Sequence, residues 1–132
     1  MINIPTDLEI LEEIHEMYIS DYLLNIKGRE AKIFVPIDCL RVARNLGTDG
    51  NIIFGRLYYD LDKRYGYKKN ETSIVHFFSL KVGEDRHCIN FPMLSSVLAG
   101  LINENKKFIT TTKISILAII LASISIIISI VK

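Results

Sequence analysis

Residues 114–131 read ISILAIILASISIIISIV, eighteen consecutive residues without a charge, and Lys132 follows them. At about 1.5 Å of rise per residue, a helix of this length extends about 27 Å, close to the hydrocarbon thickness of a bilayer. A helix of a soluble domain is seldom apolar on every side over such a length, and a signal peptide lies at the other end of a chain. The stretch therefore predicts a transmembrane helix over 114–131, and its position predicts a tail-anchored, single-pass membrane protein.

Working outward from this span, three lysines precede it closely (Lys106, Lys107 and Lys113), whereas only Lys132 follows it. Basic residues beside a span favour the cytoplasmic side of the membrane. We therefore expect 106–113 to be a basic juxtamembrane linker with its lysines as anchors. The preceding residues, 1–105, then form a cytoplasmic domain, with the C-terminus on the far side.

The charge of the soluble part is unevenly distributed along the chain. Residues 1–30 hold seven acidic and two basic side chains, whereas residues 31–113 hold eight acidic and thirteen basic ones. This asymmetry fits either an anionic partner for the later part or an acidic helix packed beside a basic region, and we expect the second. The two cysteines, Cys39 and Cys88, form no paired motif and fit a reducing compartment.

The first third of the chain carries clear helix and strand signals. Thr6 and Glu9 form a capping box, which predicts a helix from Thr6 that fades near Asn25. The β-branched stretch 32–37 predicts a short edge strand. A second helix is predicted over 39–46, with Asp38 as its N-cap and Gly47 as its end.

A tight turn at 48–50 is then predicted to lead into a third helix, capped by Asn51 and ended by Gly66. The predicted core face of this helix follows i, i+3, i+4 spacing and comprises Phe54, Leu57, Tyr58, Leu61 and Tyr65. Residues 68–72 are predicted to form a polar loop.

Residues 73–82 and 85–91 predict a hairpin. A two-residue Gly83-Glu84 loop with glycine first suits a type II′ turn, and it pairs Phe78 with Ile89 and His76 with Phe91. A three-residue loop would instead put polar residues opposite the apolar ones. Pro92 is predicted to start a last soluble helix.

This order of elements, helix-strand-helix-turn-helix-hairpin-helix, resembles a winged-helix domain. The helix-turn-helix would be DCLRVARNLGTDGNIIFGRLYYDLDKRYGY (38–67) and the wing SIVHFFSLKVGEDRHCINF (73–91). The resemblance spans about residues 31–105 and implies an α+β fold: a small winged-helix-like domain followed by the single C-terminal transmembrane helix.

In winged helices that bind DNA, the third helix enters the major groove. Carried over by position, this implies a nucleic-acid or partner face made by five residues: Arg56, Tyr59, Lys63, Arg41 and Arg44. However, Asp60 and Asp62 adjoin this face, and Glu84 and Asp85 occupy the wing tip, where they would repel phosphate. Winged helices also dock proteins, so we expect a protein partner, with a membrane-tethered DNA-binding regulator as the alternative.

The sequence lacks a P-loop, a dinucleotide-binding glycine motif, a zincin motif and a nucleophile elbow. Neither cysteine has an identifiable base, and the histidines have no metal-ligand spacing. We therefore expect no enzyme, no cofactor and no metal.

Within the predicted span, small residues recur on one side of the helix at steps of three and four: Ser115, Ala118, Ala122, Ser125 and Ser129. Small residues let helices approach closely in lipid, so this stripe predicts transmembrane packing, either with a partner or with a second copy. The alternative is that small residues are merely tolerated in a lone anchor.

Overall fold

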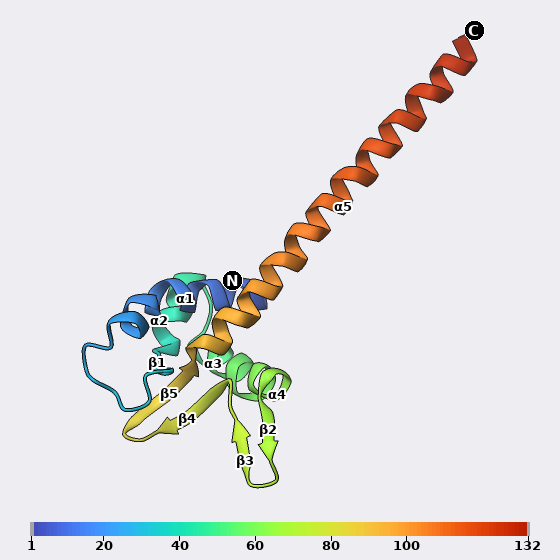
Figure 1. The fold of residues 1–132 in the computed structure, drawn as a ribbon. Helices are drawn as coiled ribbons and strands as arrows, with labels where there is room; N and C mark the ends of the chain where they lie inside the picture. The colour runs from blue at the N-terminus through green and yellow to red at the C-terminus, as the bar shows by residue number, and fades with distance from the viewer. Residues whose placement is uncertain (1, 132) are drawn as a thin grey trace. The chain divides into compact units, whose positions relative to one another are not determined.

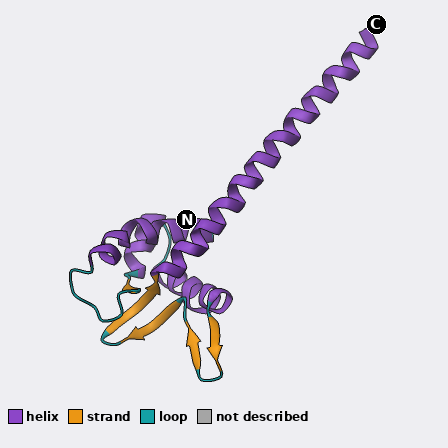
Figure 2. Ribbon diagram, viewed as in Figure 1, coloured by secondary structure: helices purple, strands orange, loops and turns teal. Residues whose placement is uncertain are grey.

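The computed structural model describes residues 2–131 as an α+β chain, with a small helix-and-sheet domain and a long apolar C-terminal helix (Figures 1 and 2). The chain divides into two compact units, Met1–Leu98 and Ala99–Lys132. The first unit contains every strand that the structure describes, the five helical segments that precede the last helix, α5 (Phe91–Val131), and the beginning of α5.

The first helix, α1 (Asp7–Leu24), begins with the predicted capping box. The Thr6 hydroxyl accepts a hydrogen bond from the Glu9 N–H at 3.1 Å, and the Glu9 carboxylate accepts one from the Thr6 N–H at 3.1 Å. The helix ends at Asn25, whose left-handed φ of 44° turns the chain. Its buried face consists of Ile10, Leu11, Ile14 and Tyr18.

The next two elements are confirmed almost as predicted. β1 (Phe34–Pro36) is a short strand, and α2 (Cys39–Leu46) follows directly. The Asp38 carboxylate accepts hydrogen bonds from two N–H groups of the first turn of α2. Gly47 ends α2 with a φ of 69°, a conformation that glycine adopts at little cost.

The third helix is one run of three segments, α3 (Gly50–Gly55), η1 (Arg56–Leu61) and α4 (Asp62–Tyr65). The prediction of Asn51 as its N-cap is wrong: the Asp49 carboxylate accepts from the Asn51 N–H at 2.8 Å and caps the helix. Segment η1 is a π-helix, in which the Asp62 N–H donates to the carbonyl of Leu57, five residues earlier. Because a π-helix has more residues in each turn than an α-helix, side chains four residues apart lie on nearly the same side of it.

This wider turn changes which side chains of the third helix enter the core. Ile53, Leu57 and Leu61, at steps of four, are fully buried. Phe54, Tyr58 and Tyr65, which the sequence placed in the core, are only half-buried. The predicted α-helical stripe is therefore confirmed for two of its five residues.

The polar loop predicted at 68–72 is instead a second hairpin, β2 (Tyr67–Asn70) and β3 (Ser73–Val75), drawn as a separate arm in Figure 1. The single strand predicted over 73–82 is also wrong, because it breaks between β3 and β4 (Phe78–Val82). The reason is Asp62, whose carboxylate accepts from the N–H groups of Phe77 and Phe78 at the break.

The main sheet is antiparallel, in the order β1-β5-β4, with β5 (Asp85–Asn90) in the centre. The two-residue loop and the pairing of Phe78 with Ile89 are confirmed. Gly83 has the positive φ, 59°, that the first position of a type II′ turn requires. The predicted pairing of His76 with Phe91 is wrong, because β5 ends at Asn90 and Phe91 is already helical.

The beginning of α5 (Phe91–Val131) closes the core of the first unit. Phe91, Leu94 and Leu98 are buried, and the Phe91 ring stacks on His15 and on Tyr22, with ring centroids 5.1 and 4.8 Å apart. This stacking covers part of His15, which is half-buried. The Asn90 carboxamide oxygen accepts from the Met93 N–H at 3.3 Å and caps α5.

In the second unit, Ala99–Lys132, the described residues are helical throughout. Residues 106–113, the predicted linker, are part of this helix. Its most apolar eighteen-residue window is long enough to cross a membrane, and none of it is buried by the rest of the chain. Lys132, which entered the prediction of orientation, lies outside the described residues.

Candidate functional site

Arg56, the first residue of the predicted nucleic-acid face, is held within the domain. Its guanidinium forms an ion pair with Asp7 and donates to the Pro5 carbonyl at 2.8 Å, and its side chain is 26% exposed. Arg64 joins this cluster through Asp7, at 2.6 Å, and Asp60, at 2.8 Å. The two arginines are thus neutralised by acids of α1 and η1.

The pKa of Asp7 reflects this cluster. Burial alone would raise the pKa, but the hydrogen bonds and charges of Arg64 and Arg56 outweigh burial and hold it below its usual value. Hydrogen bonds to Asp60 and then to Asp7 raise the pKa of Arg64. These ion pairs connect the first turn of α1 to the third helix, so they stabilise the fold.

The other members of the predicted face are exposed and occupy two helices. Tyr59 is 72% exposed and touches Tyr58 edge-on, with centroids 5.0 Å apart. Lys63 lies on α4, and Arg41 and Arg44 lie on α2. These four side chains are available to a partner, whereas Arg56 is committed to Asp7.

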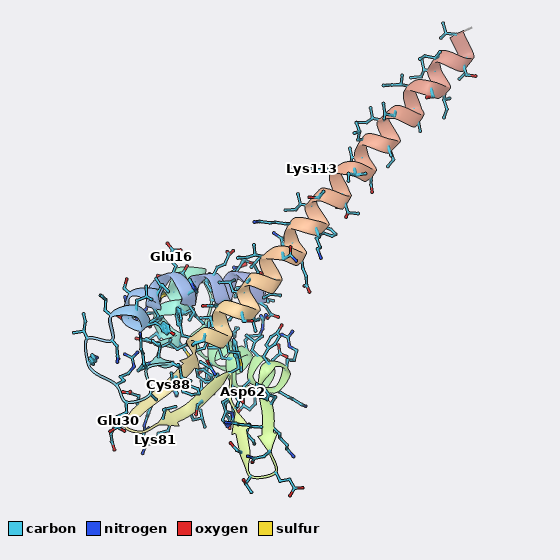
Figure 3. The ribbon with its side chains drawn as sticks, viewed as in Figure 1. Glu16, Glu30, Asp62, Lys81, Cys88 and Lys113 are labelled. Carbon is cyan, nitrogen blue, oxygen red and sulfur yellow. The ribbon has the colours of Figure 1, made fainter. Side chains whose placement is uncertain are left out.

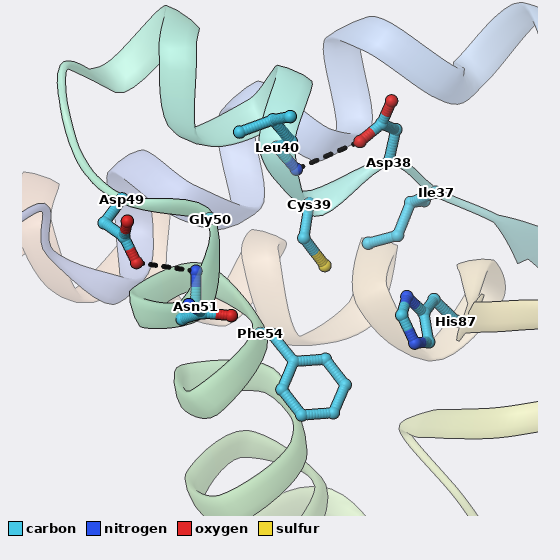
Figure 4. Close-up of a pocket in the computed structure, with 9 residues that line it drawn as sticks. All are labelled: Ile37, Asp38, Cys39, Leu40, Asp49, Gly50, Asn51, Phe54 and His87. Carbon is cyan, nitrogen blue, oxygen red and sulfur yellow. Dashed lines mark hydrogen bonds between the residues drawn. The ribbon is translucent and has the colours of Figure 1, made fainter.

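A hollow of the first unit lies where α2 and α3 begin, beside β5 (Figure 4). Its volume is about 700 Å³. The lining comes from three places in the sequence: Ile37, Asp38, Cys39 and Leu40; Asp49, Gly50, Asn51 and Phe54; and His87. We call this hollow the cap pocket, because the N-caps of both helices line it.

Local sequence chemistry builds the two sides of the cap pocket. Asp38 and Asp49 each place one carboxylate oxygen on the N–H groups of the following helix, as Figure 4 shows for Leu40 and Asn51. Gly50 lies close to α2, and a Cβ there would lie 3.3 Å from the Leu40 Cα. Both helix starts are therefore fixed close to one another.

The floor of the cap pocket is apolar. Ile37 is 6% exposed and Cys39 is 8% exposed, and Figure 4 shows the Cys39 sulfur directed into the hollow. Burial, followed by the charge of Asp38, raises the pKa of the Cys39 thiol to about 11. The thiol is therefore neutral near pH 7 and is a poor nucleophile.

His87 closes the third side in an uncommon backbone conformation. Its φ is 53°, in the left-handed region that few residues other than glycine enter. Its ring lies against Phe54, with centroids 5.2 Å apart, and its carbonyl accepts from the Ile37 N–H at 3.0 Å. The strained residue is thus held by β5 and presents an imidazole beside the aromatic ring.

Cys88 and His76 are not among the residues that line the cap pocket. Cys88 is fully buried, and burial followed by Asp85 raises its pKa to about 11. His76 lies with its Nδ1 3.2 Å from the Asp62 carboxylate, at the base of the second hairpin (Figure 3 labels Asp62). Among residues 2–131, no three histidine, cysteine or acidic side chains converge as metal ligands do.

The small-residue stripe of the span is helical, and its side chains are exposed. Ser115 and Ser125 donate their hydroxyls to their own helix, to Thr111 at 3.0 Å and Leu121 at 3.1 Å. Because these two hydroxyls are bonded within the helix, the two serines offer a neighbouring helix their small size and not a free hydrogen-bond donor. Lys106, Lys107 and Lys113 are exposed on the same helix, and Figure 3 labels Lys113.

Comparisons with family models, curated proteins and solved structures find no match to this chain.

Sequence reasoning located Asp38 as a cap but did not find the cap pocket. The signal was present in part, because aspartates before both helices and a glycine turn between them bring two helix starts together. His87 gave no local signal, since its role depends on pairing between β1 and β5, more than fifty residues apart in the chain.

Proposed function

We propose that this chain is a single-pass membrane protein, anchored by its C-terminal helix, whose winged-helix-like domain docks another protein in the cytoplasm. The observation that carries the proposal is the exposed apolar window of α5, on the same helix whose first turns close the core of the domain. A helix that is apolar on every side and unburied needs a lipid or protein environment.

The winged-helix interpretation is supported by the order of the sheet. A helix-turn-helix, α2 and α3, precedes a hairpin, β4 and β5, and this hairpin completes a sheet with β1. This is the arrangement that the resemblance implies. The second hairpin, β2 and β3, is an addition to it.

Protein docking accounts for the surface better than nucleic-acid binding. Arg56 and Arg64 are paired with acids, and the hollow beside the helix-turn-helix is lined by two carboxylates and no lysine or arginine. A phosphate backbone would be repelled there. We place the docking surface at the cap pocket.

Orientation is proposed from the lysines that flank the span on its domain side. Variants with a single added cysteine at Lys106 or at Lys69 test it, in sealed cells and in lysed cells. We expect a membrane-impermeant maleimide to label both positions only after lysis, because both would lie in the cytoplasm. The native cysteines are buried, so they should add little background labelling. Labelling in intact cells would place the domain outside, and extraction of the chain by alkaline carbonate would contradict the membrane anchor.

Docking is tested with a photo-crosslinking residue at Leu40, which lines the cap pocket and is 51% exposed. The matched control is the same residue at Lys69 on the second hairpin, which is also exposed. We expect one protein to be captured from position 40 and not from position 69. Equal capture at both positions, or none, would contradict docking at this surface.

The alternative, a membrane-tethered DNA-binding regulator, is favoured by the exposed Tyr59, Lys63, Arg41 and Arg44. It predicts that the detergent-solubilised chain binds duplex DNA with an affinity that falls steeply with salt. Binding should then weaken when Arg44 and Lys63, which are both exposed, are changed to alanine together. The docking proposal predicts no binding at low salt.

A further inference from the structure

Another hollow of the first unit lies where α4 meets the second hairpin. Its volume is about 450 Å³. The lining includes Asp62 and Lys63 of α4, Tyr67 and Lys68 of β2, Ile74 of β3, and His76 just beyond β3. We call this hollow the hairpin groove.

The pairing of the second hairpin brings the groove residues together. Lys68 of β2 lies directly opposite Ile74 of β3, so their side chains share one side of the hairpin. His76 follows, and its Nδ1 lies 3.2 Å from the carboxylate of Asp62 on α4. Because Lys63 is the next residue of α4 and also lines the hollow, both lysines belong to this junction.

The two lysines of the hairpin groove have no acidic partner in the described part of the chain. No carboxylate oxygen lies within 4 Å of the Lys63 or Lys68 nitrogen, and both side chains are exposed. Asp62 also lines the groove, but its Oδ1 accepts from two backbone N–H groups and its Oδ2 faces His76. The groove therefore has more positive than negative charge, unlike the cap pocket.

The uncharged part of the lining is aromatic and aliphatic. Tyr67 is 57% exposed and Ile74 is 56% exposed, so both offer surface to a ligand. A ligand that fits has concentrated negative charge beside a small carbon skeleton. A phosphate monoester carries a charge of about −1.5 to −2 near pH 7 and three acceptor oxygens, which match two ammonium groups. A carboxylate or a phosphodiester carries a single charge and leaves one of the two lysines unpaired.

We propose that the hairpin groove binds the phosphate monoester group of a small organic ligand. Lys63 and Lys68 donate to the phosphate oxygens, and Tyr67 and Ile74 contact the carbon skeleton. This chemistry is shared by soluble phosphate esters and by the headgroups of phosphorylated inositol lipids. The inference does not rest on the docking function, because the hairpin groove and the cap pocket have no lining residue in common.

Nuclear magnetic resonance of the full chain in phosphatidylcholine nanodiscs tests the proposal. The chain has three histidines, so ring-labelled histidine gives few signals, and His76→Gln assigns the one that borders the groove. The soluble probe is glycerol 2-phosphate, with glycerol as its control, at constant pH and ionic strength. We expect the His76 signal to shift with glycerol 2-phosphate and not with glycerol, and the affinity to fall as salt is added.

A lipid arm identifies the source of the phosphate. Nanodiscs that contain phosphatidylinositol 4-phosphate are compared with nanodiscs that contain phosphatidylinositol, which lacks the monoester. A His76 shift with the phosphorylated lipid alone, in the absence of the soluble probe, assigns the site to a lipid headgroup. A shift with glycerol 2-phosphate only assigns it to a soluble ester.

Variants of the two lysines test the contacts. Lys63→Gln and Lys68→Gln remove a charge from exposed side chains that form no ion pair among residues 2–131, so both chains should fold. Each should weaken the phosphorylated probe about two- to fivefold. Lys81→Gln is the matched control, because Lys81 is exposed on β4, outside the groove lining, and should leave the affinity unchanged (Figure 3 labels Lys81 and Asp62).

Three outcomes would overturn the proposal. The first is a His76 signal that neither glycerol 2-phosphate nor the phosphorylated lipid shifts. The second is an equal response to each phosphorylated probe and its unphosphorylated control. The third is equal weakening by Lys81→Gln and by the two groove variants, which would reduce binding to a general attraction between an anion and a basic surface.

Discussion

Asp62 and Phe77 are joined by a hydrogen bond of 2.8 Å, in which the backbone N–H of Phe77 donates to the Asp62 carboxylate. The neighbouring N–H of Phe78 donates to the same oxygen at 3.1 Å. Both phenylalanine rings are buried, so these N–H groups have little access to water. A side chain of α4 thereby takes the place of a strand partner where the second hairpin meets the main sheet.

We expect Asp62→Ala to lower the free energy of unfolding by about 1–3 kcal/mol, because it leaves partly buried N–H groups without an acceptor. Denaturant titration of the solubilised chain, followed by near-ultraviolet circular dichroism, measures this. Asp62→Asn keeps a carbonyl oxygen at the same place, so it should lose less than half as much free energy of unfolding as Asp62→Ala. Equal losses in both variants would show that the charge, not the backbone contact, is what matters.

Gly66 is predicted to be intolerant of any side chain. A Cβ there would lie 2.6 Å from the Asp62 carbonyl oxygen and 3.1 Å from that of Val75. Gly66→Ala should therefore cost about 1–3 kcal/mol of stability, as overpacking does. Gly55→Ala is the matched control: its Cβ meets only the Tyr59 ring at 3.7 Å, and the change should stabilise the helix by about 0.5–1 kcal/mol. Similar effects of the two changes would contradict the crowding argument.

The Asp7 cluster predicts a stability difference that depends on pH. Because the pKa of Asp7 is lowered in the folded chain, its charge stabilises the fold above the unfolded pKa, near 3.8, and this contribution disappears as pH falls through the folded value. Asp7→Asn should cost about 1–2 kcal/mol at pH 7, allowing for the exposure of Arg64. The free energies of unfolding of the two proteins should converge as the pH falls below the folded pKa of Asp7. A difference that is constant with pH would contradict this assignment.

The raised pKa of Cys39 predicts slow alkylation. In a Cys88→Ala background, the rate of reaction with iodoacetamide should be far lower in the folded chain than in urea, where the thiol regains its usual pKa near 9. Between pH 7 and 9.5 the folded rate should rise about tenfold per pH unit without reaching a plateau, since the folded pKa is about 11. A plateau below pH 9 would mean that the thiol is activated.

The small-residue stripe predicts packing between spans. Replacing Ala118, Ala122 and Ser125 by leucine should abolish energy transfer between labelled chains in vesicles, because bulk on this side keeps the helices apart. Ser125→Ala should leave the transfer unchanged, since the Ser125 hydroxyl is already bonded to its own helix. Leucine at Ile119 and Ile126, off the stripe, is the control. Equal transfer in the triple variant and the parent would remove the hypothesis.

The parts of this fold that were predictable from sequence are those set by contacts two to four residues apart. The Thr6–Glu9 box, the Asp38 cap and the Gly47 end are all of this kind. The Gly83 turn fixed the register of β4 against β5 because a two-residue loop admits only one pairing that buries the apolar face. Each of these signals lies within the segment that it shapes.

The parts that were missed depend on residues distant in the chain. Ile74, His76 and Phe78 alternate as one strand would, yet Asp62 breaks the strand from fourteen to sixteen positions away. The choice of Asp49 over Asn51 as a cap could not be made from residue type, since both are good caps. The cap pocket itself required β5 to bring His87 beside α3, which is a consequence of sheet pairing.

The strand that leads into α5 is the central one of its sheet. β5 is hydrogen-bonded to β1 on one edge and β4 on the other, and Asn90 joins it to the helix by capping α5 while also donating to the carbonyl of His76. A mechanical load applied to the span therefore enters the domain at its most firmly held strand. Two ladders must rupture before that strand can be withdrawn, so the whole sheet resists tension applied to α5.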